Sequence, residues 1–171
     1  MDLKSKLRQV MDFPKEGINF IDITTVLQDA DAFKECIDIM KEKAAAFGDF
    51  DIIVGPESRG FIFATPLAIG LGKGFAPIRK KGKLPYKTVC AEYQLEYGTD
   101  SLEMHIDAVK KGQRVVIVDD LLATGGTTEA NIKLVEQLGG EVAGIIYFIE
   151  LTFLGGKDKL KGYKVDSVVE F

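Results

Sequence analysis

One continuous stretch, residues 114–128, restricts the fold of this chain more than any other. It reads Arg-Val-Val-Ile-Val-Asp-Asp-Leu-Leu-Ala-Thr-Gly-Gly-Thr-Thr. Four β-branched or similarly apolar residues in succession, Val115 to Val118, are typical of a strand buried on both faces. Asp119 and Asp120 follow where that strand is expected to end, and a glycine-rich turn then opens a helical pattern. This order predicts one strand–turn–helix unit of a parallel α/β sheet.

The same stretch carries two features that bear on a ligand. A glycine-rich turn at a helix start presents backbone N–H groups and the positive end of the helix dipole to an anion. Carboxylates repel phosphate, so Asp119 and Asp120 make sense if the ligand also carries hydroxyls or a divalent cation. Two adjacent acids are costly to keep without partners, which favours a ligand site over a merely structural strand end. The pattern is neither a Walker A loop nor a dinucleotide fingerprint, and it indicates a phosphorylated sugar with magnesium.

Strand and helix patterns alternate along the rest of the chain and indicate a single domain. We expect a doubly wound, mainly parallel sheet flanked by helices, with an antiparallel pair at residues 88–97 and 102–106. The other expected elements are helices at 2–10, 31–47 and 60–71 and after the central turn, and strands at 51–55, 74–78, 142–151 and 165–171. Residues 12–22 are broken by proline and glycine yet rich in large apolar groups. They fit either a loop packed over the core edge or an apolar wall for a ligand.

Composition excludes several classes of protein. With 171 residues the chain can bury a substantial core, and a net charge of −4 argues against a general nucleic-acid or membrane-surface binder. No apolar run reaches membrane-spanning length, and the N-terminal residues lack the apolar core of a signal peptide. Cys36 and Cys90 are far apart and have no metal-ligand spacing, so we expect a reducing compartment, the cytoplasm.

Several segments beyond the central stretch resemble one family. The central stretch is similar to the phosphoribosyl pyrophosphate motif of the type I phosphoribosyltransferases. Segments in the order of the adenine-specific branch of that family cover nearly the whole chain: Phe13-Pro14-x-x-Gly17-Ile18-x-Phe20-x-Asp22, Ser58-Arg59-Gly60-Phe61, Ile78-Arg79-Lys80-x-Gly82-Lys83-Leu84-Pro85, Tyr93-x-Leu95-Glu96-Tyr97-Gly98 and Glu150-Leu151-Thr152. The resemblance implies the type I phosphoribosyltransferase fold, with a small N-terminal hood formed mainly by residues 1–28 and a flexible β-arm loop.

The resemblance also implies a reaction: adenine and phosphoribosyl pyrophosphate give AMP and pyrophosphate. It implies a 5′-phosphate site at Ala123, Thr124, Gly125, Gly126 and Thr127, with Asp119 and Asp120 on the ribose hydroxyls. It assigns pyrophosphate to Ser58, Arg59, Arg79, Lys80 and Lys83. Magnesium is expected as cofactor, held mainly by substrate oxygens and water rather than by direct protein ligands. A cis peptide bond is expected between Glu57 and Ser58.

The remaining roles concern the purine. Phe20 and Leu151 would sandwich the adenine ring, and backbone atoms at Asn19, Phe20 and Ile21 would read its polar edge. Position 21 is often arginine among relatives and is isoleucine here, which removes one possible side-chain contact. Residues 91–100 resemble the family's catalytic loop, with Glu96 and Tyr97, together with Asp119 and Asp120, as the catalytic residues.

Two rival functions remain open. One is a phosphoribosyltransferase for another purine, and the other is a non-catalytic sensor of phosphoribosyl pyrophosphate. Such sensors usually carry an added DNA-binding domain, for which the chain has neither spare length nor a basic patch, and Glu96 with Tyr97 also favours an enzyme. Relatives are homodimers, and residues 13–21 and 79–93 are candidate interface segments. No nucleic-acid or membrane partner is expected.

Overall fold

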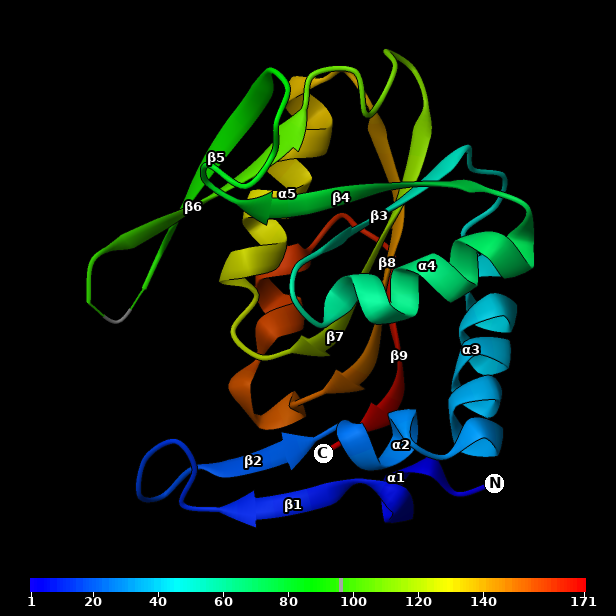
Figure 1. Cartoon of the computed structure of the whole chain (residues 1–171), viewed down its shortest axis with the longest axis vertical. Coiled ribbons are helices and arrows are strands. Elements are labelled where there is room, and N and C mark those ends of the chain that lie inside the picture. The colour runs from blue at the N-terminus through cyan, green and yellow to red at the C-terminus, as the bar shows by residue number, and fades with distance from the viewer. Residues whose placement is uncertain (96) are drawn as a thin grey trace.

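A computed structural model describes residues 1–95 and 97–171 and, within them, one large mixed sheet covered by helices on both faces (Figure 1). The strands of this sheet lie in the order β5-β6-β4-β3-β7-β8-β9, and β1 and β2 form a separate two-stranded sheet. The helices are α1 Leu3–Lys6, α2 Thr24–Leu27, α3 Ala30–Ala45, α4 Gly60–Leu71 and α5 Gly126–Gln137. The strands are β1 Arg8–Met11, β2 Asn19–Asp22, β3 Ile52–Pro56, β4 Gly74–Lys80, β5 Thr88–Gln94, β6 Thr99–His105, β7 Arg114–Leu122, β8 Glu141–Glu150 and β9 Val165–Glu170. Short 3-10 helices follow β8 at η1 Thr152–Leu154 and η2 Gly156–Leu160.

The sheet is mainly parallel, as the alternating pattern predicts. β3 pairs in parallel with β4 and β7, β7 with β8, and β8 with the edge strand β9. β5 and β6 are antiparallel to each other, and β6 joins the sheet antiparallel to β4. We call the β5–β6 hairpin the arm, and it projects from the edge of the sheet in Figure 1. The expected doubly wound sheet with an antiparallel pair is therefore confirmed.

β7 lies between two hydrophobic cores, because successive side chains of a strand point to opposite faces. Val116 and Val118 belong to the core that contains α3 and α4. Val115 and Ile117 belong to the core that contains α5 and the arm. All four side chains are fully buried, so the prediction of a strand buried on both faces is confirmed.

Two boundaries differ from expectation by four residues, and the strands of the arm, at 88–94 and 99–105, lie within three residues of the expected 88–97 and 102–106. β7 does not end before Asp119 but continues to Leu122, because the long strand β8 supplies pairing partners as far as Glu150. At the N-terminus the expected helix ends at Lys6. The backbone at Leu7 is extended, which ends the helix, and residues 8–11 form β1, paired antiparallel with β2.

The described helices include none that is both long and apolar enough to cross a lipid bilayer.

Candidate active site

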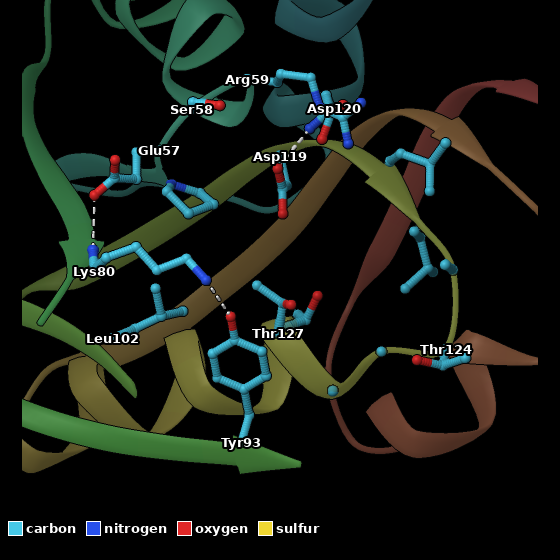
Figure 2. Close-up of a pocket in the computed structure, with 17 residues that line it drawn as sticks. Glu57, Ser58, Arg59, Lys80, Tyr93, Leu102, Asp119, Asp120, Thr124 and Thr127 are labelled. Atoms are coloured by element: carbon cyan, nitrogen blue, oxygen red, sulfur yellow. Dashed lines mark hydrogen bonds and ion pairs between the residues drawn. The ribbon is translucent and has the colours of Figure 1, made fainter. Parts of the chain in front are cut away.

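A cavity of about 630 Å³ opens where several parallel strands end. This is the edge at which open α/β sheets bind ligands. Its lining comes from the end of β3 and the turn after it, the end of β4, the arm, the end of β7 and the loop that leads into α5 (Figure 2). The residues are Pro56, Glu57, Ser58, Arg59, Lys80, Tyr93, Leu102, Asp119, Asp120, Leu121, Leu122, Ala123, Thr124, Gly125, Gly126, Thr127 and Thr128.

The loop of residues 123–127 forms the anion-binding end of the cavity. Gly125 has a φ of +90°, a left-handed conformation that glycine adopts without strain, and it immediately precedes α5. A side chain at Gly125 would also meet the carbonyl oxygen of Gly156 at 3.0 Å. The first N–H groups of a helix have no partners within the helix, so the loop presents donors and a positive dipole end to the cavity.

Asp119 and Asp120 lie in the second half of β7 and are both buried. Burial raises the pKa of the Asp119 carboxyl well above its ordinary value, and the neighbouring Asp120 charge raises it further. The N–H of Asp120 donates to Asp119 Oδ1 at 2.8 Å and acts in the opposite direction, as does Arg59. Asp120 Oδ2 lies 2.9 Å from Arg59 Nε, close enough for an ion pair, but makes no hydrogen bond with the described residues. It is a buried acceptor beside the cavity with capacity for a ligand hydroxyl.

Each of three cations at the site is paired with a carboxylate. Arg59 pairs with Asp120, the Nε of Arg79 lies 3.3 Å from Glu57 Oε1, and Lys80 pairs with Asp100. Burial raises the pKa of Glu57, but the Lys80 backbone N–H at 2.7 Å and the Arg79 guanidinium lower it below its ordinary value overall. These three cations are therefore held in ion pairs within the protein. An anionic ligand has to displace the paired carboxylates in order to bind the cations.

The turn between β3 and α4 packs tightly against β7. The peptide bond between Glu57 and Ser58 is cis, as expected. A side chain at Gly60 would come within 2.6 Å of Asp119 Oδ1 and 2.8 Å of Pro56 Cδ. Glycine at this position therefore allows the turn to approach the acids of β7 closely.

The structure brings together most of the residues predicted for the ribose phosphate and pyrophosphate. Asp119, Asp120 and residues 123–127 line the cavity, as do Ser58, Arg59 and Lys80. Arg79 and Lys83 are not among the lining residues. Arg79 is paired with Glu57, which does line the cavity, and Lys83 lies in the turn after β4, where its N–H donates to the Lys80 carbonyl.

None of the four residues predicted for adenine lines the cavity, and two of them, Phe20 and Leu151, contact residues that do. The guanidinium carbon of Arg59 is 5.7 Å from the centre of the Phe20 ring, and the Phe13 ring packs edge-on against Phe20 at 5.2 Å. Ile21 is buried in the core, while Asn19 is exposed. The Leu151 N–H donates to the Leu122 carbonyl at 2.9 Å, which fixes Leu151 beside the lining.

The sequence predicts two catalytic residues on the arm, and the structure describes one of them, Tyr97. Tyr97 is 84% exposed and lies outside the cavity lining. Glu96 lies outside the described residues.

Some residues of the site have no role in the sequence-based prediction. Glu57 holds Arg79 and Lys80, and Tyr93 and Leu102 close the cavity on the arm side. Thr128 lines the cavity, and its hydroxyl forms a short hydrogen bond with the buried hydroxyl of Tyr147. Two features of the sequence could have indicated these residues: the acid in the turn after β3 and the alternating apolar pattern of the arm. Neither feature shows which side chains meet, because that depends on pairing between strands that are distant in sequence.

The site offers little by itself to hold a metal. In residues 1–95 and 97–171 no group of three or more histidine, cysteine, aspartate or glutamate side chains could bind one. The two adjacent carboxylates of β7 fit a hard cation that arrives on ligand oxygens and keeps most of its waters. A glycine-rich anion site, two acids and several cations around one cavity suit a ligand that carries phosphates, hydroxyls and a divalent cation.

Comparison with known proteins agrees with this geometry. Residues 22–170 match the family model described as the phosphoribosyl transferase domain. The chain is 78% identical to the adenine phosphoribosyltransferase of Acetivibrio thermocellus over the full length of both. It is similar to the crystal structure of that enzyme from Thermoanaerobacter pseudethanolicus, with a TM-score of 0.95, 58% identity and coverage of 99% and 98% of the two chains. The Saccharomyces cerevisiae enzyme, complexed with an imino-altritol bisphosphate and adenine, gives a TM-score of 0.92 at 42% identity, covering 98% and 96%.

Proposed function

The chain belongs to the adenine phosphoribosyltransferase family, enzymes that transfer the 5-phosphoribosyl group of phosphoribosyl pyrophosphate to adenine, and we propose which of its residues do this work. The products are AMP and pyrophosphate, and the reaction is a step of purine salvage. The observation that carries the residue assignments is the single cavity that joins the loop of residues 123–127, two acids and a set of cations.

The ribose 5-phosphate is bound at the C-terminal end of β7. Backbone N–H groups of residues 123–127 and the hydroxyls of Thr124 and Thr127 hold the phosphate at the start of α5. Asp119 and Asp120 accept hydrogen bonds from the two ribose hydroxyls through their carboxyl oxygens. The buried Asp120 oxygen without a hydrogen bond supports this role.

Pyrophosphate is bound across the cavity by Ser58, Arg59, Arg79, Lys80 and Lys83. Magnesium, when bound with the substrate, neutralises part of the pyrophosphate charge. The residues present fit this ion as one carried by substrate oxygens, with Asp119 and Asp120 nearby. Positive charge around the leaving group stabilises it as the glycosidic bond breaks and the ribose takes on oxocarbenium character.

Adenine is bound on the side of the cavity that Leu122 borders. Phe20 and Leu151 contact the two faces of the purine ring, and the backbone of Asn19 to Ile21 reads its polar edge. The hood, residues 1–28, supplies Phe20, and the packing of Phe13 and Arg59 around that ring supports the assignment. Because the backbone does the reading, isoleucine at position 21 leaves the specificity for adenine in place.

Residues 91–100 exclude water during transfer, because water attacking the same carbon would waste the substrate. Glu96 acts in acid–base catalysis at the purine, and Tyr97 helps to cover the site. We also propose that the enzyme is a cytoplasmic homodimer. The two free cysteines, Cys36 and Cys90, suit a reducing compartment.

A substrate panel tests the function. Pyrophosphate release is measured with phosphoribosyl pyrophosphate, magnesium and either adenine, hypoxanthine, guanine or xanthine. We expect kcat/KM for adenine to exceed that for each 6-oxopurine by a large factor. A comparable kcat/KM for a 6-oxopurine would move the chain to that sister activity. Binding of phosphoribosyl pyrophosphate without turnover of any purine would instead favour the sensor.

A further inference from the structure

The ammonium group of Lys80, the last residue of β4, is held by two side chains of the arm. Lys80 Nζ donates to the Tyr93 hydroxyl at 2.9 Å and forms an ion pair with Asp100 Oδ2 (Figure 2 shows the bond to Tyr93). The Tyr93 hydroxyl donates to the same Asp100 oxygen at 3.2 Å. An ammonium group has three donors, so two of the three are directed to the arm.

Strand register brings these groups together. Lys80 pairs with Leu102 across β4 and β6, and Tyr93 pairs with Asp100 across the arm. Residues two apart on a strand share a face, so Asp100 lies on the same face as Leu102, which lines the cavity. Because β4 ends at Lys80, the part of the arm beyond Ser101 extends past the sheet (Figure 1). The ion pair between Lys80 and Asp100 connects this projecting part to β4.

The same ammonium group borders the ligand cavity. Lys80 and Tyr93 line it, and the side chains of Lys80 and Asp100 keep 44% and 34% of their exposure, so a ligand can reach the pair. A pyrophosphate group carries more negative charge than one carboxylate. It is therefore a strong competitor for an ammonium group that a half-exposed aspartate holds.

We propose that Asp100, supported by Tyr93, is a positioning residue that holds the Lys80 ammonium group against the arm until pyrophosphate takes its place. Exchange of the carboxylate for the ligand removes the side-chain contact between Lys80 and the projecting part of the arm, while the pairing of β4 with β6 remains. Asp100 therefore opposes ligand binding and couples it to release of this projecting part. This inference rests on the assignment of Lys80 to pyrophosphate under the proposed function.

The first test is binding of magnesium pyrophosphate to the full chain, measured by titration calorimetry. Asp100→Asn removes the competing charge, so we expect the dissociation constant to fall about two- to fivefold, the range that a half-exposed ion pair supports. The matched control is Asp107→Asn, which removes an exposed carboxylate from the turn after β6 and should leave the constant unchanged. Thermal unfolding verifies the fold of each variant, and Asp100→Ser replaces the asparagine variant if that one does not fold.

A double-mutant cycle separates exchange at Lys80 from a general charge effect. Lys80→Met should weaken binding, and Asp100→Asn should then have no further effect. In the unliganded state, chymotryptic cleavage after the exposed Tyr97 should be faster in Asp100→Asn than in the wild type and in Asp107→Asn. Unchanged or weaker pyrophosphate binding by Asp100→Asn, equal tightening with and without Lys80, or equal cleavage rates would each overturn the proposal.

These experiments distinguish failure of the proposed function from failure of the proposed exchange at Lys80. If the wild type makes no AMP from adenine and phosphoribosyl pyrophosphate but Asp100→Asn still binds pyrophosphate more tightly through Lys80, the exchange stands and the reaction assignment falls. If AMP is formed and the cycle shows no coupling between Asp100 and Lys80, the reaction stands and the exchange falls.

Discussion

Substitution of Gly60 by alanine tests how closely the turn before α4 must approach the acids of β7. The added methyl group would lie 2.6 Å from Asp119 Oδ1, where ordinary contact begins at 3.4 Å, an overlap of about 0.8 Å (3.4 minus 2.6). Asp119 cannot yield freely, because the same oxygen accepts the Asp120 N–H at 2.8 Å. On the other side the methyl group meets the Pro56 ring at 2.8 Å. Either the acid or the turn that carries Arg59 has to move.

The expected effect on activity is larger than that on stability. Overpacking of this kind costs roughly 1–3 kcal/mol, which for a domain of this size lowers the unfolding midpoint by about 2–12 °C. A shift approaching 1 Å in a substrate-binding group costs about 100-fold in turnover. We therefore expect Gly60→Ala to remain folded at 25 °C while kcat/KM for phosphoribosyl pyrophosphate falls by about two orders of magnitude.

The control is the same substitution at the other end of the same helix. At Gly70 the methyl group would meet only the flexible end of Lys41, at 3.3 Å, so Gly70→Ala should leave kinetics unchanged and stabilise α4 by up to about 1 kcal/mol. Steady-state pyrophosphate release and thermal unfolding are measured for both variants. Wild-type kinetics and an unchanged midpoint in Gly60→Ala would refute the reasoning, since the close approach would then carry no constraint.

Three further predictions follow from buried groups. Asp119→Asn should lower turnover strongly yet stabilise the unliganded fold at neutral pH by roughly 1–3 kcal/mol, because it removes a buried charge. The pKa of Asp119 is raised in the folded state, so its ionisation costs stability as pH rises through that pKa, and unfolding midpoints should converge with the wild type near pH 4. Gly156→Ala would place a methyl group 2.4 Å from the Ala123 carbonyl oxygen, so KM for phosphoribosyl pyrophosphate should rise about tenfold or more, whereas Gly74→Ala, whose methyl group would meet Ile52 at an ordinary contact distance of 4.0 Å, should leave KM unchanged. Asn131 is fully buried and neither of its amide atoms has a hydrogen bond to the described residues, so Asn131→Leu should raise the unfolding free energy by roughly 1–3 kcal/mol; a lower midpoint would contradict this.

The fold could be predicted where the pattern is local. The apolar run at Val115–Val118 reflects burial of one segment, and this prediction is confirmed. The alternation around Tyr93 and Leu102 predicts an antiparallel pair, which is also confirmed, although Glu103 is buried between Leu102 and Met104. Strand ends could not be predicted in the same way. β7 continues beyond Asp119 because β8 offers partners there, and residues 8–11 form a strand because residues 19–22 pair with them.

The same distinction holds for the site. Asp119, Asp120 and the loop of residues 123–127 are contiguous in sequence, so their common location follows from a single strand–turn–helix unit. Glu57 and Asp100 meet their cations across strands, and the sheet register that joins them is set by the packing of the whole domain. Sequence reasoning found the cations, but the carboxylates that hold them required the structure.

The ion pairs at the site also affect which anions it accepts. Arg59, Arg79 and Lys80 each contact an internal carboxylate, so a free inorganic anion that reaches one of them leaves a displaced acid beside it. A ligand whose phosphates and hydroxyls are joined in one molecule makes its later contacts at high effective concentration, and it can replace several such partners together. We therefore expect the acids, as much as the cations, to discriminate phosphoribosyl pyrophosphate from the simple phosphates that surround it in solution.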